Sequence, residues 1–253
     1  EWRNELLGSG IRTKNGNIIK FSRVELKSGT KYIQAEAETI EDNPKKVFIV
    51  FGPEHAPLEQ RIVELAWTEA RSFKPDILLF CAFHFDEEAA KDIDELTPDK
   101  AGMQLLKIQM NTDLLTKDLR KKSISNESFW LIGQPDIKIH KCNDDKIKVE
   151  VLGFDYYNPK TGNVESGGTQ NISMWMLDID YDERCIFPSQ VFFPLSSKNQ
   201  DWGLLAKNLK AEIDIEKIEF YSGNISLEFN PGNQVAVKII DDRGIESLKI
   251  IRL

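Results

Sequence analysis

The chain has few cysteines, few histidines and no long apolar run. Its three cysteines, Cys81, Cys142 and Cys185, are widely spaced and odd in number, so they encode neither a disulfide framework nor a Cys-x-x-Cys metal knuckle. The longest apolar windows, near residues 47–51 and 77–83, are far shorter than the ~20 residues of a membrane helix. No basic-then-apolar signal peptide opens the chain. We therefore expect a soluble protein of a reducing cytoplasm, with no membrane partner.

An excess of positive charge is also missing. The formal net charge of the 253 residues is −8. This is the wrong sign for a domain that binds nucleic acid mainly by neutralising phosphates. Any contact with DNA must therefore be local.

Several catalytic motifs are absent too. The sequence contains no phosphate-binding loop of the Gly-x4-Gly-Lys-Ser/Thr type and no serine nucleophile elbow. The turn after Phe51 has one glycine, Gly52, followed by Pro53, where a nucleotide cofactor would need several backbone amides. We expect no cofactor in this chain.

What is present is an α/β pattern. Continuous apolar strands are expected at 46–51, 76–83 and 103–110, with helices at 57–73 and 86–96 between them. This βαβαβ order predicts a mostly parallel or mixed sheet. Before it, residues 1–45 hold a hairpin at 14–17 and a strand around 32–35, and Trp2–Gly8 reads as the end of a helix that began earlier, which suggests a piece of a longer protein.

After the βαβαβ core the pattern becomes β-rich. A short helix is expected at 111–122, then antiparallel hairpins from strands at 129–132, 137–140, 147–156 and 172–179. A helix at 202–213 and strands at 225–229, 235–240 and 246–253 would form a small C-terminal β-unit. We expect three segments: an N-terminal hairpin extension at 1–45, the α/β domain at 46–200 and the helix plus β-unit at 201–253.

Two local surfaces are candidates for nucleic-acid contact. The first is a run of cations with hydroxyls and an amide, the groups that position phosphates, followed by the aromatic residues Phe129 and Trp130. It comprises Lys117, Arg120, Lys121, Lys122, Ser123, Ser125 and Asn126. The second is Tyr156, Tyr157 and Asn158 at the approach to a hairpin turn. The structural alternatives are cations that complement a helix C-terminus and tyrosines buried in a core.

Two patterns suggest metal chemistry. Glu25-Leu26-Lys27 has the Glu-x-Lys spacing of metal-dependent nucleases, but no matching upstream acid accompanies it. Cys81-x-x-His84 and His140-x-Cys142 could supply four zinc ligands if their strands met. However, His-x-Cys places its two side chains on opposite faces of one strand, so core packing is the simpler interpretation. We assign no catalytic, cofactor-binding or metal-binding residue.

Long, ordered segments carry a resemblance to a known family. The segments include VFGPEHAPLEQRIVELAWTEA, KPDILLFCAFHFDEEAAKDIDE, VEVLGFDYYNPKTGNVESGG and MWMLDIDYDERCIFPSQVFFP. The chain resembles the C-terminal region of prokaryotic site-specific, adenine-specific DNA methyltransferases related to the modification subunit of type III restriction systems. By resemblance, the parent would bind S-adenosylmethionine and methylate the N6 amino group of a flipped adenine.

The matched region lacks the cofactor and catalytic motifs of the family, so we expect a role without catalysis. Asp155-Tyr156-Tyr157-Asn158-Pro159 has the residue types of a base-binding loop in the wrong order, so no catalytic residue is carried over. The expected function is DNA clamping or docking of a restriction or helicase subunit. The alternatives are a divergent nuclease-like α/β enzyme domain acting beside the methyltransferase and a purely structural domain for homodimer formation.

Overall fold

The computed structural model describes residues 1–13, 17–115, 128–158, 161–194, 221–242 and 244–253. The chain forms two compact units. Unit 1 comprises Glu1–Ile132 and Tyr156–Val164, and unit 2 comprises Gly133–Asp155 and Glu165–Leu253. In the described part of the chain, no helix is long and apolar enough to span a membrane.

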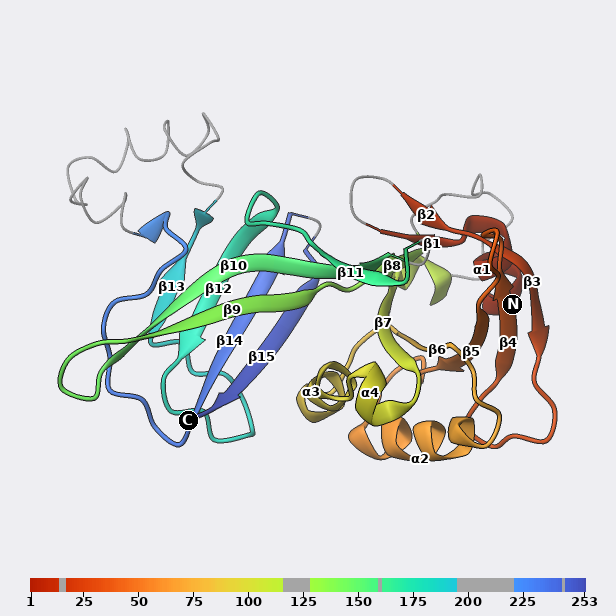
Figure 1. Ribbon diagram of the computed structural model, residues 1–253, viewed down its shortest axis with the longest axis horizontal. Coiled ribbons are helices and arrows are strands. Elements are labelled where there is room, and N and C mark those ends of the chain that lie inside the picture. Colours follow the sequence, from red (N-terminus) through yellow and green to blue (C-terminus); the bar gives the residue numbers. More distant parts are fainter. Residues whose placement is uncertain (14–16, 116–127, 159–160, 195–220, 243) are drawn as a thin grey trace. The chain divides into compact units, whose positions relative to one another are not determined.

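Unit 1 contains the predicted βαβαβ arrangement (Figure 1). Its three central strands run parallel: β5 (Lys46–Phe51), β6 (Ile77–Ala82) and β7 (Gln104–Met110). The helices between them are α2 (Gln60–Arg71), α3 (Glu87–Glu95) and the short α4 (Pro98–Ala101). The apolar runs and helical spacing of the sequence therefore gave the right element types, and the α/β class is confirmed.

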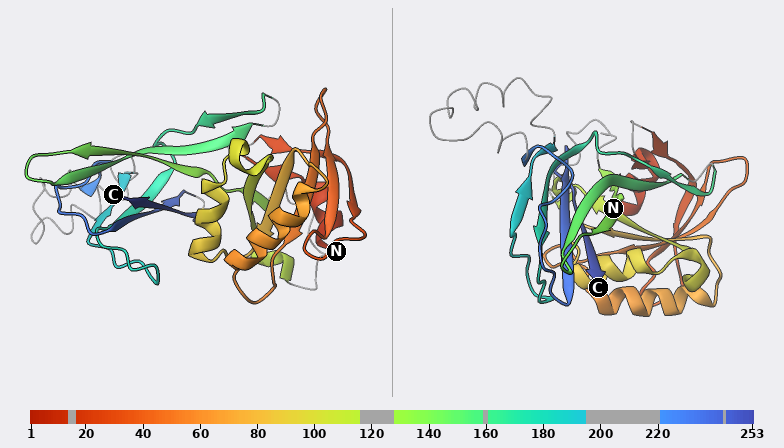
Figure 2. Two further views of the ribbon diagram at one scale, coloured as in Figure 1. Left: turned by 60° about the horizontal axis from the view of Figure 1, so that its bottom comes forward. Right: turned by 60° about the vertical axis from the view of Figure 1, so that its left-hand side comes forward.

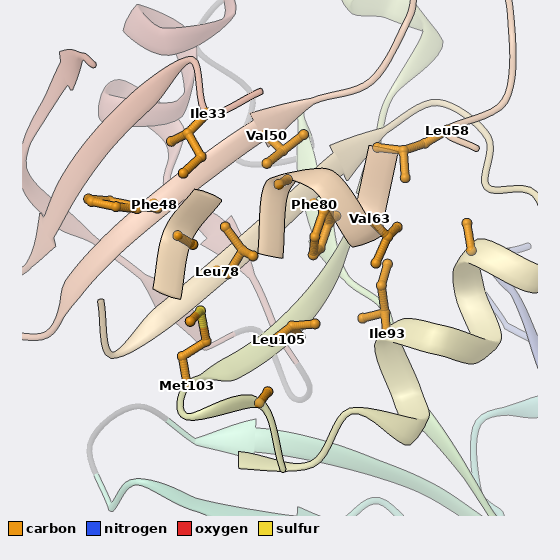
Figure 3. Close-up of a cluster of buried hydrophobic side chains, with 14 of the residues drawn as sticks. Ile33, Phe48, Val50, Leu58, Val63, Leu78, Phe80, Ile93, Met103 and Leu105 are labelled. Atoms are coloured by element: carbon orange, nitrogen blue, oxygen red, sulfur yellow. The ribbon is translucent and has the colours of Figure 1, made fainter. Parts of the chain in front are cut away.

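One face of these strands packs against the helices (Figure 3). Because strand side chains alternate between faces, Phe48, Leu78 and Phe80 point toward the helices, while their neighbours point to the opposite face. The helices contribute Val63 and Ile93 to this core. All six residues of β6 are buried, which explains why its sequence is apolar throughout. Burial of each such large side chain stabilises the fold by roughly 1.5–3 kcal/mol.

The parallel strands belong to an eight-stranded mixed sheet of order β2-β1-β8-β7-β6-β5-β4-β3. The added strands are β1 (Ile11–Arg12), β2 (Ile18–Ile19), β3 (Phe21–Leu26), β4 (Ala35–Thr39) and β8 (Phe129–Leu131). Residues 1–45, expected as an N-terminal hairpin extension, provide four strands of this sheet, and β4 pairs directly with β5.

The two ends of the strand order are joined by one stretch of chain. β2 pairs with β1 and β3 pairs with β4, yet only Lys20 separates β2 from β3. The carbonyl of Lys20 accepts a hydrogen bond from the Ile40 N–H, on the β4 side. The sheet therefore curls, and residues 18–26 form both of its edge strands, β2 and β3.

Helix α1 (Trp2–Ser9) packs on the face opposite to α2 and α3. Its Leu6 is fully buried, and the Trp2 ring lies 5.7 Å from Phe51 and 5.5 Å from Phe83 between centroids. The helix ends at Gly10, whose φ of 67° suits glycine and whose Cβ, if present, would lie 2.5 Å from the Ile19 carbonyl oxygen. Glycine is therefore required where the helix turns into β1.

The strand expected around residues 32–35 is wrong in its position, because β4 begins at Ala35. The backbone just before it is held by a side chain instead. The Glu69 carboxylate in α2 accepts hydrogen bonds from the N–H groups of Lys31, Tyr32 and Ile33, at 2.7, 2.9 and 3.2 Å. A long-range carboxylate thus takes the donors that a strand ladder would have used.

The helix expected at 111–122 is present only as a single 3-10 turn, η2 (Thr112–Leu115), within the described residues. The side chain of Asn111 accepts a hydrogen bond from the Asp113 N–H at 2.9 Å, which favours a local turn at this point. The rest of the expected helix, and the one expected at 202–213, lie outside the described residues.

Unit 2 is built from antiparallel strands (Figures 1 and 2). One sheet has the order β11-β10-β9, from β9 (Gln134–Lys141), β10 (Ile147–Asn158) and β11 (Asn163–Ser166). The end of β10, from Tyr156, and the start of β11, to Val164, belong to unit 1. The other has the order β13-β12-β14-β15, from β12 (Ile172–Asp178), β13 (Gln190–Phe192), β14 (Gln234–Asp241) and β15 (Glu246–Arg252). The antiparallel hairpins are confirmed, and the C-terminal strands pair with β12 in the same sheet.

The core of unit 2 centres on Trp175, which stacks on Phe192 with centroids 4.0 Å apart. The indole N–H of Trp175 donates to the Gly223 carbonyl at 3.1 Å. The strand expected at 225–229 is reduced to two isolated bridges, which join Ile225 to Glu150 and Phe229 to Ile147. This segment also bonds to β13, where the Leu227 N–H donates to Gln190.

Candidate nucleic-acid interface

The basic segment predicted to bind phosphates lies between β7 and β8. Its residues Lys117, Arg120, Lys121, Lys122, Ser123, Ser125 and Asn126 all lie outside the described residues. The chain on either side is described, and the Asn111 N–H donates to the Ser128 carbonyl at 3.0 Å. Both flanks thus lie at the carboxyl end of β7, the edge where open α/β sheets commonly bind ligands.

The aromatic residues after this segment have different surroundings. Phe129 is fully buried and belongs to the core. Trp130 is half-buried, and the Arg12 guanidinium lies 4.9 Å from its ring centroid, because Arg12 is opposite Trp130 in the pairing of β1 with β8. Trp130 lies four residues after Asn126, the last residue of the predicted basic segment.

The second predicted surface, at the end of β10, is mostly internal. Tyr156 and Tyr157 are buried, with 8% and 9% of their surface exposed, and Asn158 is half-buried. Burial, followed by the charges of Asp76 and Glu41, raises the pKa of Tyr157. Little of either ring is available for stacking on a base, and the two carboxylates would repel a phosphate. DNA contact through these residues stays a prediction.

The second predicted surface and the described flanks of the basic segment lie at different edges of the parallel strands. Asp76, whose charge acts on Tyr157, immediately precedes β6 and accepts a hydrogen bond from the Lys46 N–H at the start of β5. The tyrosines are therefore near the amino-terminal edge of the parallel strands, whereas Asn111 and Ser128, which flank the basic segment, lie at the carboxyl edge. Six-residue strands separate these edges by roughly 20 Å.

The GFDYYNPKTGNVESGG stretch forms the β10–β11 hairpin, as predicted. The pairing of β10 with β9 shifts between Val151 and Gly153, which marks a bulge. Gly153 has a φ of 139°, and a Cβ there would lie 2.3 Å from the Gly168 carbonyl oxygen. Phe154 also accepts a hydrogen bond from the Gly167 N–H. Gly153 and Gly168, at the two ends of the stretch, thus allow the backbones of the two arms of the hairpin to come into close contact.

Asp136, Asp155 and Lys249 form a polar group that sequence reasoning missed. Asp136 pairs with Gly153 in the β9–β10 register, so it lies diagonally from Asp155. Burial and the Asp136 charge raise the pKa of Asp155, while Lys249 on β15 opposes that shift. The three residues are far apart in the sequence and share no motif. Only the strand register could have revealed them.

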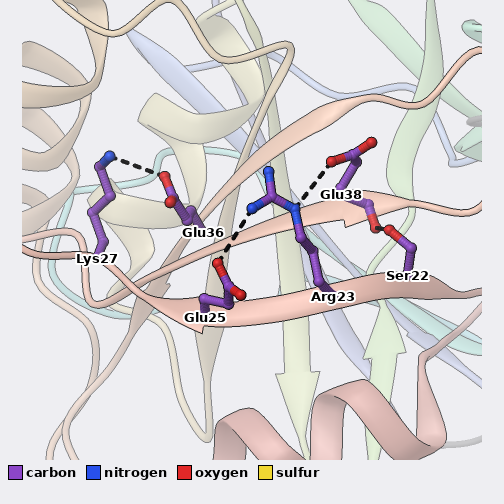
Figure 4. A network of polar contacts seen from close by, with 6 residues as sticks. All are labelled: Ser22, Arg23, Glu25, Lys27, Glu36 and Glu38. Atoms are coloured by element: carbon purple, nitrogen blue, oxygen red, sulfur yellow. Dashed lines mark hydrogen bonds and ion pairs between the residues drawn. The ribbon is translucent and has the colours of Figure 1, made fainter.

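The Glu-x-Lys motif is part of a ladder of ion pairs on β3 and β4 (Figure 4). Lys27 pairs with Glu36 at 2.9 Å, and Arg23 pairs with Glu25 at 3.2 Å and with Glu38 at 3.0 Å. Glu25 and Lys27 therefore each have another partner, across the strand or two residues along it. Their spacing is explained by the pairing of the strands.

The cysteines and histidines do not assemble into a metal site. Cys81 is fully buried in β6, where burial raises the pKa of its thiol. His84 is exposed after the strand, and His140 pairs with Glu150 at 2.7 Å in unit 2. Among the residues that the structure describes, no group of three or more His, Cys, Asp and Glu side chains could hold a metal ion.

The turn after β5 has no free space beside its glycine. A Cβ on Gly52 would lie 2.8 Å from the Ala82 Cβ, so this glycine allows the ends of β5 and β6 to approach each other. Just beyond, Leu58 and Phe85 form a parallel bridge between the two loops. The glycine that precedes α2 therefore serves strand packing, and its amide donates to the Cys81 carbonyl at 2.8 Å.

Comparison with known protein families, with curated proteins and with solved structures finds no match to this chain. The resemblance to DNA methyltransferases therefore stays a prediction from the sequence segments. Function has to be argued from the residues themselves.

Proposed function

We propose that this chain is a non-catalytic domain of a site-specific adenine-N6 DNA methyltransferase that docks a protein subunit for its parent. In this proposal the parent supplies S-adenosylmethionine binding and base flipping. This chain supplies a folded surface for a restriction or helicase subunit. Contact with DNA is confined to local surfaces.

The observation that carries the proposal is the packing of Gly52. At the corresponding turn of a nucleotide-binding fold, glycine leaves room for the cofactor to approach the backbone. Here that room is taken by Ala82, and the Gly52 amide is bonded to Cys81. Glu25 and Lys27, whose spacing resembles that of a nuclease motif, likewise form ion pairs within the sheet. Both features favour a role without catalysis.

The charge balance favours docking over general clamping. A net charge of −8 repels duplex DNA at long range, and clamping needs many lysine and arginine contacts to phosphates. A protein subunit with a basic face has no such penalty. Homodimer formation would also fit, and light scattering distinguishes a dimer from a monomer that binds another subunit.

Duplex binding tests the clamping alternative. Fluorescence anisotropy of a labelled duplex is measured with the full chain between 50 and 300 mM salt. We expect weak binding with a shallow salt dependence. A steep logarithmic slope, of about −0.9 for each phosphate contacted, would favour clamping and overturn docking as the main role.

The coding sequence upstream of Glu1 tests the family. A Pro-Pro-Tyr loop and a Phe-x-Gly-x-Gly-like turn in the same reading frame would support the methyltransferase parent. An upstream sequence that encodes an unrelated enzyme would contradict it.

A metal-dependent nuclease is the second candidate, favoured by the carboxylates of Asp136 and Asp155 beside Lys249. Two carboxylates can bind a magnesium ion, and a lysine can stabilise the attacked phosphate. Magnesium-dependent DNA cleavage that is lost in Asp155→Asn but kept in Glu25→Ala would support this reading. Loss in Glu25→Ala alone would point to the β3 motif. We expect no cleavage from the unaltered chain.

A further inference from the structure

Strand β9 lies at the end of its sheet, in unit 2 (Figure 1). Among the described strands, β9 pairs only with β10. Strand β15 approaches the chain just before β9, where the Ser247 hydroxyl donates to the Gly133 carbonyl at 3.1 Å. The part of β9 that lies farther from this contact is Ile137–Lys141, which we call the β9 edge.

The hydrogen bonds between β9 and β10 determine where the backbone of the β9 edge points. The Cys142 N–H donates to the Lys146 carbonyl at 2.8 Å, in continuation of the β9–β10 register. Hydrogen-bonded pairs alternate with non-hydrogen-bonded pairs along an antiparallel ladder. Ile137 and Ile139 therefore do not bond to β10. Their N–H and C=O groups point away from it, toward the free side of the strand.

The other side of β10 supports the same alternation. Val149 lies opposite Ile139 in the register. Its N–H donates to the Ser226 hydroxyl at 2.9 Å, and its carbonyl accepts the Ser226 N–H at 2.8 Å. The backbone of Val149 is thus turned away from Ile139, as the alternation requires. Both residues direct their backbone groups outward, and on β10 these groups already have partners.

The side chains of the β9 edge are apolar on one face and basic on the other. Ile137 and Ile139 are half-buried, whereas the residues opposite them on β10 are fully buried. Lys138 is exposed on the opposite face, and Lys141 is exposed at the end of the strand. Neither lysine forms an ion pair with any residue that the structure describes. A further strand would complete the burial of the isoleucines and could neutralise the lysines.

We propose that the β9 edge binds an extended acidic segment of a protein partner, which adds an antiparallel strand to the sheet. The backbone of the segment bonds to Ile137 and Ile139, and its apolar side chains cover them. A carboxylate lies opposite Lys138, in a non-hydrogen-bonded pair, where opposing side chains are closest. The preference for acid is local, because the chain as a whole is acidic. This inference rests on the proposed docking role, since it names the segment that docks.

A peptide that alternates glutamate and valine, as long as one strand, tests the backbone contacts. Its binding to the full chain is measured by fluorescence anisotropy at about 150 mM salt, where charges act over only about 8 Å. N-methylation of the valines removes the donors that face Ile137 and Ile139. N-methylation of the glutamates adds the same groups on the other side and is the matched control. We expect roughly tenfold weaker binding of the first methylated peptide than of the second, because two hydrogen bonds are lost.

Lys138→Gln tests the charge. Opposite charges that face each other across two strands contribute up to about 1 kcal/mol, so we expect roughly twofold to fivefold weaker binding. Lys148→Gln is the matched control, because Lys148 is on the same face but on β10, where it already pairs with Glu228 at 3.1 Å. It should bind the peptide as the unaltered chain does. Thermal unfolding checks that both variants are folded.

Lysines on an edge strand can also serve only to prevent association between copies of a chain. In that case Lys138→Gln would self-associate in light scattering and keep its affinity for the peptide. This result would overturn the proposal, as would undetectable binding of the unmethylated peptide or equal binding of the two methylated peptides. Duplex binding tests the docking role separately, so the two proposals can fail independently.

Discussion

The Lys107 ammonium lies 2.6 Å from a carboxylate oxygen of Asp94, and only 2% and 4% of the two side chains are exposed. The pair joins β7 to α3 on the helix-covered face of the sheet. Removing one partner of such a pair leaves a charge in an apolar environment. We predict that Lys107→Met destabilises unit 1 by about 3–5 kcal/mol, as measured by urea unfolding.

The double variant Lys107→Met/Asp94→Leu is the control for this first prediction. It replaces both charges with apolar groups of similar size, so most of the lost stability should return. A double variant as unstable as Lys107→Met would show that the pair is needed for more than charge compensation.

Gly153→Ala should disrupt the β10–β11 hairpin. The added Cβ would meet the backbone of Gly168 at 2.3 Å, and the φ of 139° is strained for alanine. We expect a loss of several kcal/mol, on the order of the largest single-residue effects, with reduced amide protection along β10. Gly162→Ala is the matched control, because its φ is 71° and no atom lies within 4 Å of its added Cβ. It should cost about 1 kcal/mol.

Glu69 should make the stability of unit 1 depend on acid. Burial acts to raise its pKa, but the three backbone donors outweigh burial, and the net shift is downward. A carboxyl whose folded pKa is lowered contributes stability above its unfolded pKa, near 4.3, and loses it as the pH falls through the folded value. In Glu69→Gln, the urea midpoint of unit 1 should change less between pH 5 and pH 3 than it does in the unaltered chain. An unchanged acid dependence in this variant would contradict the assignment.

Asp155 should make unit 2 less stable as the pH rises, which is opposite to the effect of Glu69 on unit 1. Burial and Asp136 raise its pKa, so the native state binds more protons than the unfolded state between the two pKa values. Stability therefore falls as the pH rises through that window and is recovered on acidification. Asp155→Asn should remove this fall and stabilise unit 2 at pH 7. Asp144→Asn, an exposed change in the same β9–β10 hairpin, should have little effect. A destabilised Asp155→Asn at pH 7 would contradict the predicted sign.

The central α/β elements could be predicted because their signals are local. The apolar run at Lys46–Phe51 has the same bounds as β5, and the helix expected at 57–73 is found as Gln60–Arg71. Each is specified by periodicity and by the prolines and glycines at its ends. The helix begins three residues later than expected because Leu58 forms a β-bridge with Phe85, which keeps this part of the chain extended.

The elements that could not be predicted depend on partners distant in the sequence. Tyr32 and Ile33 look like strand residues, but Glu69 binds their amides from a helix more than 35 positions away. Strand β13 was not predicted at all, because its three residues form a strand only through pairing with β12. Periodicity contains no information about such contacts.

The candidate sites differ in the same way. Tyr156 and Tyr157 could be recognised as residue types that bind bases, but their burial follows from the packing around the end of β10. Lys27 was recognised only as part of the Glu-x-Lys spacing, whereas its ammonium lies 4.8 Å from the ring centroid of Phe73, just after the end of α2. Only the fold brings Lys27 and Phe73 together.

The chain passes between the two units three times, since residues 156–164 return to unit 1 after the first part of unit 2. A single cut after Ile132 therefore yields an incomplete unit 1. Any attempt to express it alone must retain the hairpin or replace it with a fused copy. Neither unit is one contiguous segment of the chain, so neither can be exchanged as a single cassette.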